Sequence, residues 1–301
     1  MSMSKNNENN VVTFEDRIAG ALYGFAIGDA MGATTEFMSQ DQIKQQFGVV
    51  KDIIGGGWLH IKAGSVTDDT EMMLCVCRAL ATVLEPVKDL NDAFGYNFMK
   101  ECRHQFIEWM GSKPIDIGAQ CAQSILEMHL GKKLTSSYNA QALGNGGLMR
   151  ALPCALLDVP FLNKAQGMMT HNNGTCEFAV LHYHNLVVNQ IYGDGKMHFE
   201  SVGLKEPTGH VINTLNNVMY WFGQSNTFED AIISAVNHGG DADTIAALTG
   251  GLAGAKFGIN AIPRRWINAL DASVMAKLAN FAAFVKIYVA FSQTKDFCGI
   301  M

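Results

Sequence analysis

The sequence is poor in proline and in charged residues, and it has no excess of basic residues. Six prolines occur in 301 residues, 17% of the residues are charged, and the formal net charge is −6. Because a nucleic-acid-binding surface is usually basic, this balance argues against a nucleic-acid partner. Strand-like alternation of apolar and polar residues is also lacking, and we expect no membrane-spanning run. The composition predicts an all-α protein without a membrane partner.

The seven cysteines follow no disulfide or zinc-binding pattern. They are scattered through apolar segments at positions 75, 77, 102, 121, 154, 176 and 298. The close pair Cys75 and Cys77 has no second pair with which to form a zinc site. No secretory signal is recognised before them, so we expect reduced thiols in a cytoplasmic protein.

Apolar residues recur at helical spacing along most of the chain. The predicted helices span residues 14–31, 69–84, 91–111, 116–131, 145–158, 174–193, 208–223, 227–237, 243–257 and 270–292. In the first of them, Gly20, Gly24, Gly28 and Gly32 fall at every fourth residue. Such a stripe exposes bare backbone on one helical face and predicts a very close crossing with another helix.

The chain shows no composition break that would mark a second large domain. Residues 1–13 are polar and have almost nothing to bury, so we expect them to form a flexible arm. Residues 14–301 are expected to form a single domain.

Two segments far apart in the chain place acids and hydroxyls directly before long apolar stretches. The first is Thr67-Asp68-Asp69 and the second is Asp241-Ala242-Asp243-Thr244. Either segment alone fits a helix cap, in which side-chain oxygens bind free backbone N–H groups. If the two segments meet, their four carboxylates would repel one another unless a divalent cation lay among them.

The ligand atoms of such a site would all be oxygens. They would come from Thr67, Asp68, Asp69, Asp241, Asp243 and Thr244. Oxygen ligands favour magnesium, manganese or calcium over zinc. A pair of such ions lowers the pKa of a shared water, so hydrolysis or binding of sugar hydroxyls is the natural chemistry.

Four groups of segments together resemble the motifs of the ADP-ribosylglycohydrolase family, and their order and separation also match. They are Gly28-Asp29-Ala30-Met31-Gly32 with Glu36-Phe37, Thr67-Asp68-Asp69-Thr70-Glu71-Met72, Gly144-Asn145-Gly146 with Met149-Arg150, and Gly240-Asp241-Ala242-Asp243-Thr244. The resemblance extends from about Asp16 to the C-terminal helices. Within the family, Gly55-Gly56-Gly57-Trp58-Leu59 and Lys113-Pro114-Ile115-Asp116-Ile117-Gly118 are most similar to the bacterial dinitrogenase reductase-activating glycohydrolases.

The resemblance implies a fold, a cofactor and a reaction. The fold would be a compact all-α single domain with a binuclear metal cleft, holding two Mg²⁺ or Mn²⁺ ions on the six oxygen ligands named above. The reaction would hydrolyse the N-glycosidic bond between ADP-ribose and a modified arginine of a target protein.

The resemblance also implies roles for individual residues. Those expected in catalysis are Glu36, Asp69 and Asp116, and those expected to bind substrate are Gly144, Asn145, Gly146, Gly147, His171 and His210. Simpler roles stay open: a surface salt bridge for Glu36, a helix cap for Asp116 and a core hydrogen bond for His171. Ala119 and His210 depart from the subfamily pattern, which has Asn and Tyr at these positions, so substrate scope and turnover depend on them.

Two other functions remain compatible with the sequence. An immunity protein would neutralise an ADP-ribosyltransferase toxin by steric blocking through the arm, with or without hydrolysis. A phosphohydrolase acting on free nucleotides would use the same kind of metal site but release AMP rather than ADP-ribose.

Overall fold

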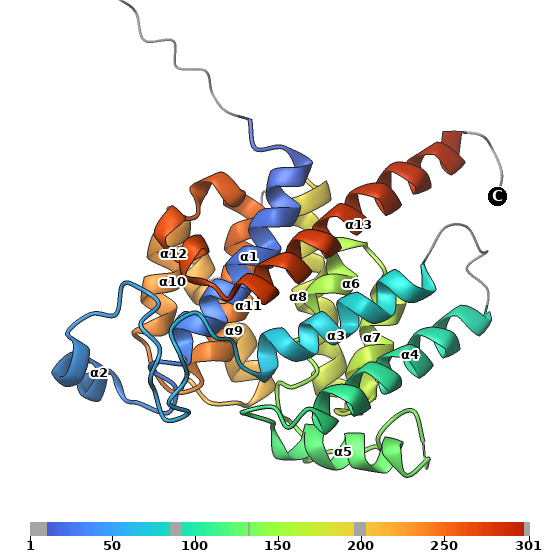
Figure 1. The fold of residues 1–301 in the computed structure, drawn as a ribbon, viewed down its shortest axis with the longest axis horizontal. Coiled ribbons are helices and arrows are strands. Elements are labelled where there is room, and N and C mark those ends of the chain that lie inside the picture. Colours follow the sequence, from blue (N-terminus) through green and yellow to red (C-terminus); the bar gives the residue numbers. More distant parts are fainter. Residues whose placement is uncertain (1–10, 85–91, 132, 196–202, 298–301) are drawn as a thin grey trace, which may run out of the picture.

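The computed structural model describes residues 11–84, 92–131, 133–195 and 203–297 (Figure 1). The α-helices are α1 Phe14–Gly32, α2 Gln40–Phe47, α3 Asp68–Val83, α4 Asp92–Gly111, α5 Ala119–His129, α6 Leu152–Leu156, α7 Pro160–Met168, α8 Gly174–Tyr192, α9 Val211–Gln224, α10 Phe228–Val236, α11 Ala242–Phe257, α12 Arg264–Ala269 and α13 Ala272–Phe297, with a 3-10 turn at Ile259–Ala261. In these ranges extended pairing is limited to two isolated bridges, Gly56 with Ile61 and Gly144 with His210. The all-α prediction is confirmed.

Helices α1 and α11 cross at very short range. A Cβ atom added at Gly24 would lie 2.3 Å from the carbonyl oxygen of Gly250, and one added at Gly28 would lie 2.0 Å from that of Ala246. The other two glycines of the stripe meet α11 in the same way. The predicted crossing is therefore confirmed. Because the two helices run antiparallel, the C-terminal end of α1 lies beside the N-terminal end of α11.

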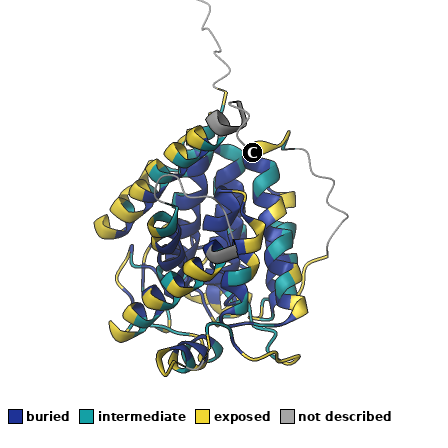
Figure 2. Cartoon of the chain, turned by 90° about the vertical axis from the view of Figure 1, so that its right-hand side faces the viewer, coloured by how far each residue is buried: buried dark blue, intermediate teal, exposed yellow. Residues whose placement is uncertain are grey.

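The core is built around this pair of helices. α11 is buried without interruption from Ala242 to Ala255, and α1 is buried from Gly24 to Gly32. Figure 2 shows the buried residues gathered in the inner helices and the exposed residues on the outer helices and loops. Such a core holds its backbone rigidly, because close-packed interiors tolerate little displacement.

Three short helices, α2, α7 and α12, are absent from the sequence prediction. α2 carries mostly polar residues around the single buried Ile43, so apolar spacing gives little signal there. The segment predicted as a helix over 145–158 is helical only from Leu152. Before that point the chain turns, with the N–H groups of Leu148 and Met149 both donating to the Asn145 carbonyl oxygen.

The C-terminal helix α13 differs from the expectation of no membrane-spanning run. Within the described residues, Ala272–Ser292 is long and apolar enough to cross a membrane, with a mean hydropathy of 1.5 and 28% of the window buried. One such helix is weak evidence for membrane insertion. Val274, Leu278 and Val285 join the hydrophobic core, so one face of α13 serves the protein interior.

Only the last residues of the predicted arm are described. Residues 1–10 lie outside the described residues, and Val11 is exposed. Thr13 caps α1: its hydroxyl accepts from the Asp16 N–H, and the Asp16 carboxylate accepts from the Thr13 N–H.

Candidate metal centre and active site

The first acid segment begins helix α3, and a carboxylate from α1 holds it in place. The buried Asp29 carboxylate accepts hydrogen bonds from the Thr67 N–H at 3.0 Å, the Thr67 hydroxyl at 2.9 Å and the Thr70 N–H at 3.0 Å. Thr67 is the N-cap of α3, and its hydroxyl oxygen accepts from the Asp69 N–H. Capping of α3 is therefore shared by Thr67 and Asp29, which leaves the carboxylates of Asp68 and Asp69 available for a ligand.

The second acid segment begins helix α11, beside the first. The Thr244 hydroxyl donates to Oδ2 of Asp69 at 3.2 Å, so the two segments meet in a direct hydrogen bond. Asp241 makes no side-chain cap of α11; its Oδ2 instead accepts from the Asn145 side-chain amide at 2.6 Å. The Asp243 carboxylate accepts from the Thr244 N–H at 2.9 Å.

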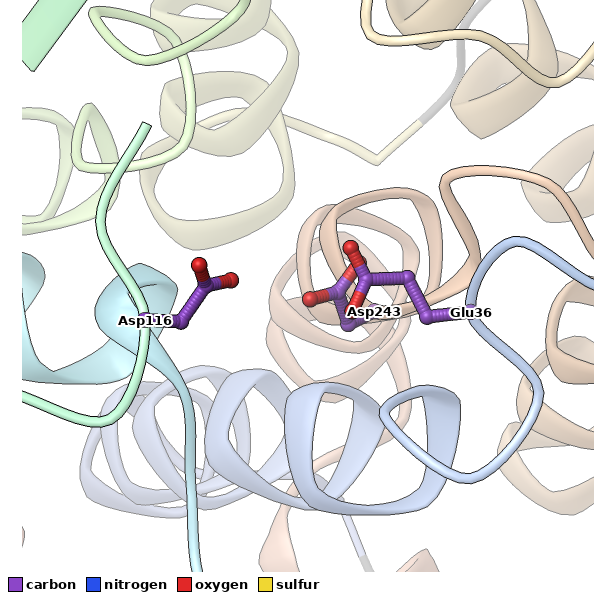
Figure 3. Close-up of side chains that lie close together, drawn as sticks. All are labelled: Glu36, Asp116 and Asp243. Carbon is purple, nitrogen blue, oxygen red and sulfur yellow. The ribbon is translucent and has the colours of Figure 1, made fainter. Parts of the chain in front are cut away.

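A third group of acids, drawn from three distant parts of the chain, completes the cluster (Figure 3). Glu36, Asp116 and Asp243 each offer a carboxylate oxygen, and the three oxygens lie within 4.8 Å of one another. Glu36 follows α1, Asp116 precedes α5 and Asp243 lies in α11. This arrangement could hold a metal ion, and it brings the predicted catalytic acids Glu36 and Asp116 to a predicted ligand.

The electrostatics of the cluster favour a counter-charge. Burial, with the Asp116 carboxylate adding to the effect, raises the pKa of Asp68 to about 7 and that of Asp241 to about 6. Burial also raises the pKa values of Asp69 and Asp243 well above the ordinary value, with neighbouring carboxylates adding to the effect. A divalent cation would offset both the burial and the repulsion.

The donor set fits a hard cation. The candidate ligand atoms are all carboxylate or hydroxyl oxygens, which suit magnesium, manganese or calcium. Oδ1 of Asp69 is buried and has no hydrogen-bond partner in the protein. A buried carboxylate oxygen without a partner is costly, so a bound cation would satisfy it.

The indole of Trp58 fixes the Glu36 carboxylate. Trp58 Nε1 donates to Oε2 of Glu36 at 2.5 Å. Burial raises the pKa of Glu36 to about 8 in spite of this bond, and the carboxylates of Asp116 and Asp241 add to the rise. Without a cation, Glu36 would therefore be mostly protonated at pH 7, and a bound cation would lower its pKa and free the carboxylate to accept a proton.

The glycine loop 144–147 is held from behind by a buried arginine. Arg150 is fully buried, and its guanidinium donates to the Gly146 carbonyl oxygen at 2.6 Å and to the Thr170 hydroxyl at 2.7 Å. It also donates to the side chain and the carbonyl oxygen of Gln166. All these acceptors are neutral, so Arg150 keeps a buried positive charge behind the loop.

The predicted substrate-binding histidines lie in different environments. His171 is 4% exposed, and its ring nitrogen Nδ1 lies 2.8 Å from the Thr170 hydroxyl. Its ring packs behind the loop, since a Cβ atom added at Gly146 would lie 2.7 Å from it. His210 is half-buried and caps α9, with Nδ1 accepting from the Ile212 N–H. Roles for both residues in substrate binding stay predictions.

Two residues of the site, Asp29 and Trp58, were assigned no role from the sequence. Asp29 stands in the first resembling motif, yet only the fold reveals that it caps α3 from α1. Trp58 stands in a second motif, and nothing local to it indicates that its indole reaches Glu36. For Asp29 a signal was present, because an acid inside an apolar, glycine-striped helix needs a buried partner.

Comparison with known proteins agrees with this architecture. The family model described as ADP-ribosylglycohydrolase matches residues 10–196 and 187–294. The chain is 36% identical to the ADP-ribosyl-[dinitrogen reductase] glycohydrolase of Rhodospirillum rubrum, over 86% of this chain and 92% of that protein. It is 30% identical to the ADP-ribosylarginine hydrolase Tri1 of Pseudomonas putida, over 84% of this chain and 73% of that protein.

A solved structure leads to the same conclusion. A chain of an ADP-ribosylglycohydrolase-related protein complex superposes with a TM-score of 0.74 and 25% identity, covering 90% of this chain and 99% of that one. The matching family model, the similar relatives and the shared fold show that the chain belongs to the ADP-ribosylglycohydrolase family.

Proposed function

We propose that this protein hydrolyses the N-glycosidic bond between ADP-ribose and a modified arginine of a target protein. The observation that carries the proposal is the hydrogen bond between Thr244 and Asp69, which joins two buried acid segments into one oxygen-rich site. Two relatives support the choice of substrate, since one is named for ADP-ribosylarginine and the other for ADP-ribosylated dinitrogen reductase.

Two Mg²⁺ or Mn²⁺ ions are the proposed cofactors. Their ligands would be drawn from Thr67, Asp68, Asp69, Asp241, Asp243 and Thr244. When bound, such ions supply Lewis acidity and a water of lowered pKa.

The remaining roles in the reaction are assigned to side chains and backbone groups around this site. Glu36, held by Trp58, is the proposed acceptor of the proton of the attacking water. Asp116 is half-buried beside Glu36, and its proposed role is that of a catalytic acid that assists the chemistry at the ribose. The loop 144–147 is the proposed cradle for the diphosphate, and the buried charge of Arg150 favours an anion there. Asn145 connects this loop to Asp241, so nucleotide binding and the acid cluster share one rigid support.

The biological setting is proposed from chemistry alone. The six described cysteines are buried and free, which suits a reducing cytoplasm. There the enzyme would reverse a regulatory modification or the damage done by an ADP-ribosylating toxin. Removing residues 1–10 tests the steric alternative: a hydrolase keeps its turnover, whereas a blocking protein loses its affinity for the toxin.

The reaction itself is tested with an arginine-ADP-ribosylated protein. The purified chain is incubated with it in Mg²⁺ or Mn²⁺, with and without chelator, and the products are separated by chromatography. We expect intact ADP-ribose, no release with chelator, and no release by Asp68→Asn or Asp243→Asn, while the exposed control Lys164→Gln keeps full activity. AMP as product would identify a phosphohydrolase, and release that survives both chelation and mutation would exclude the proposed mechanism.

A further inference from the structure

Two aromatic rings stand exposed directly beside the acid cluster. The side chain of Phe37 is 66% exposed and that of Trp58 is 48% exposed, although both are large and apolar. Their ring centroids lie 5.3 Å apart with an interplanar angle of 49°. Phe37 follows Glu36 in the chain, and Trp58 binds Glu36 through its indole N–H. The two rings therefore border the predicted catalytic carboxylate.

The backbone holds Phe37 in an unfavourable conformation. Its φ is 60°, in the left-handed region that a bulky residue seldom adopts. The Phe37 N–H donates to the Gly240 carbonyl oxygen at 2.7 Å, which ties the residue to the start of the second acid segment. A strained backbone that leaves an apolar ring in solvent does not stabilise the fold. This conformation of Phe37 is therefore better explained by binding of a ligand to the ring.

The support under Trp58 is equally rigid. Gly57 has a φ of 64°, and a Cβ atom there would lie 2.1 Å from the carbonyl oxygen of Ala33. The loop that carries Trp58 is thus packed on the backbone between α1 and Glu36. Both rings are held in fixed positions relative to the acids, as a preorganised binding site requires.

We propose that Phe37 and Trp58 form the subsite for the leaving group, the guanidinium and methylene stem of the modified arginine. The proposal rests on the proposed function. A planar, delocalised cation stacks on aromatic faces, and its alkyl stem packs on the same apolar surface. Glu36 and Asp116 offer carboxylate oxygens at the edge of this surface. A guanidinium can donate hydrogen bonds to these oxygens, whereas a diphosphate has only acceptor oxygens and cannot.

The first test distinguishes binding of the leaving group from binding of ADP-ribose. Steady-state kinetics on ADP-ribosylarginine are compared with the inhibition constant of free ADP-ribose, which lacks the guanidinium. Phe37→Leu is expected to raise KM about two- to fivefold with little change in kcat, and to leave the ADP-ribose inhibition constant unchanged. Trp58→Phe keeps a ring but loses the bond to Glu36, so it is expected to lower kcat more than it raises KM. The exposed control Phe178→Leu on α8 should match the wild type.

The second test does not depend on turnover. Binding of agmatine, which carries a guanidinium, is compared with binding of cadaverine, which carries a compact ammonium, by calorimetry on the metal-loaded protein. Agmatine should bind more tightly, and Phe37→Leu should reduce the difference, because one of the two rings is lost. Equal binding of the two amines, or equal weakening of ADP-ribose and ADP-ribosylarginine by Phe37→Leu, would overturn the subsite. Absence of hydrolysis by the wild type, with agmatine binding intact, would instead refute the proposed function and leave the cation subsite standing.

Discussion

The Asp29 carboxylate accepts hydrogen bonds from both the N–H and the hydroxyl of Thr67. One residue lies inside α1 and the other caps α3, so this contact sets the position of the first acid segment relative to the α1–α11 pair. Through Thr67, the crossing of α1 with α11 is linked to the candidate metal ligands.

Asp29→Asn tests this link. An amide oxygen cannot replace both carboxylate oxygens, so at least one donor at the start of α3, an N–H or the Thr67 hydroxyl, loses its acceptor. We expect a loss of about 1–3 kcal/mol in the free energy of unfolding, together with weaker metal binding and lower turnover. The matched control is Asp16→Asn, which replaces a half-buried capping carboxylate at the start of the same helix. The control should lose little stability and no turnover; equal effects of the two variants would contradict the role of Asp29.

Gly24→Ala tests the crossing of α1 with α11. The new Cβ would lie 2.3 Å from a backbone oxygen, so the helices must separate. We expect a loss of about 1–3 kcal/mol or more, measured by urea denaturation, and reduced turnover because the two acid segments move apart. Gly95→Ala is the control: Gly95 lies in α4 and a Cβ there meets nothing within 4 Å. That variant should gain about 0.5–1 kcal/mol from helix propensity.

The sequence predicted those parts of the site whose signal is local. The glycine stripe predicted the helix crossing, and two similar acid segments predicted an oxygen site, because periodicity and residue type are readable without the fold. The contact of Trp58 with Glu36 and the bond of Arg150 to Thr170 were not predictable. Each joins residues that are 20 or more positions apart, and no periodic pattern in the sequence indicates that they meet.

The helix predicted over 145–158 shows the same limit. Its apolar spacing is real, but the buried Arg150 side chain needs acceptors on every side, including the Gly146 carbonyl oxygen. That oxygen would otherwise be available to a helical N–H. The cost of leaving a buried cation without partners outweighs the helix propensity of a few residues.

Arg150→Met tests the support of the glycine loop. The variant removes a buried charge and leaves the Gly146 carbonyl oxygen and the Thr170 hydroxyl without their donor. We expect a loss on the order of 3 kcal/mol in the free energy of unfolding, and weaker binding of ADP-ribose by calorimetry. Arg265→Met is the control, because Arg265 pairs with Asp52 and Glu229 at the exposed surface. That pair contributes at most about 1 kcal/mol, and ADP-ribose affinity should not change.

Asp243→Asn tests the need for a cation by its effect on stability. In the metal-free protein this carboxylate is buried among others, so its removal relieves repulsion and should raise Tm. Addition of Mn²⁺ should raise the Tm of the wild type and leave that of the variant nearly unchanged. Both effects are followed by scanning calorimetry after dialysis against chelator. A variant less stable than the wild type without metal, yet still stabilised by Mn²⁺, would show that Asp243 is structural rather than a ligand.

His171 makes the free energy of unfolding depend on pH, and the direction of its pKa shift fixes the sign of that dependence. Burial and the nearby charge of Arg150 lower the pKa of His171 from 6.5 to about 3. Between these two pH values the unfolded chain binds a proton that the folded protein does not, so the folded state loses stability as the pH falls. The loss attributable to His171 is about 1.4 kcal/mol for each pH unit below 6.5.

A comparison of the wild type with His171→Gln isolates this effect. The carboxylates of the acid cluster titrate in both proteins, so their contributions largely cancel in the difference between the two free energies of unfolding. Urea denaturation at pH 7.5, 5.5 and 4.5 should show the wild type losing its advantage over the variant as the pH falls. A difference that stays constant over this range would mean that His171 has the same pKa in the folded and unfolded states, so that it is protonated in the folded protein below its ordinary pKa of 6.5. At such pH values it would be a charged group behind the glycine loop, and that loop would have a second positive charge with which to bind a diphosphate.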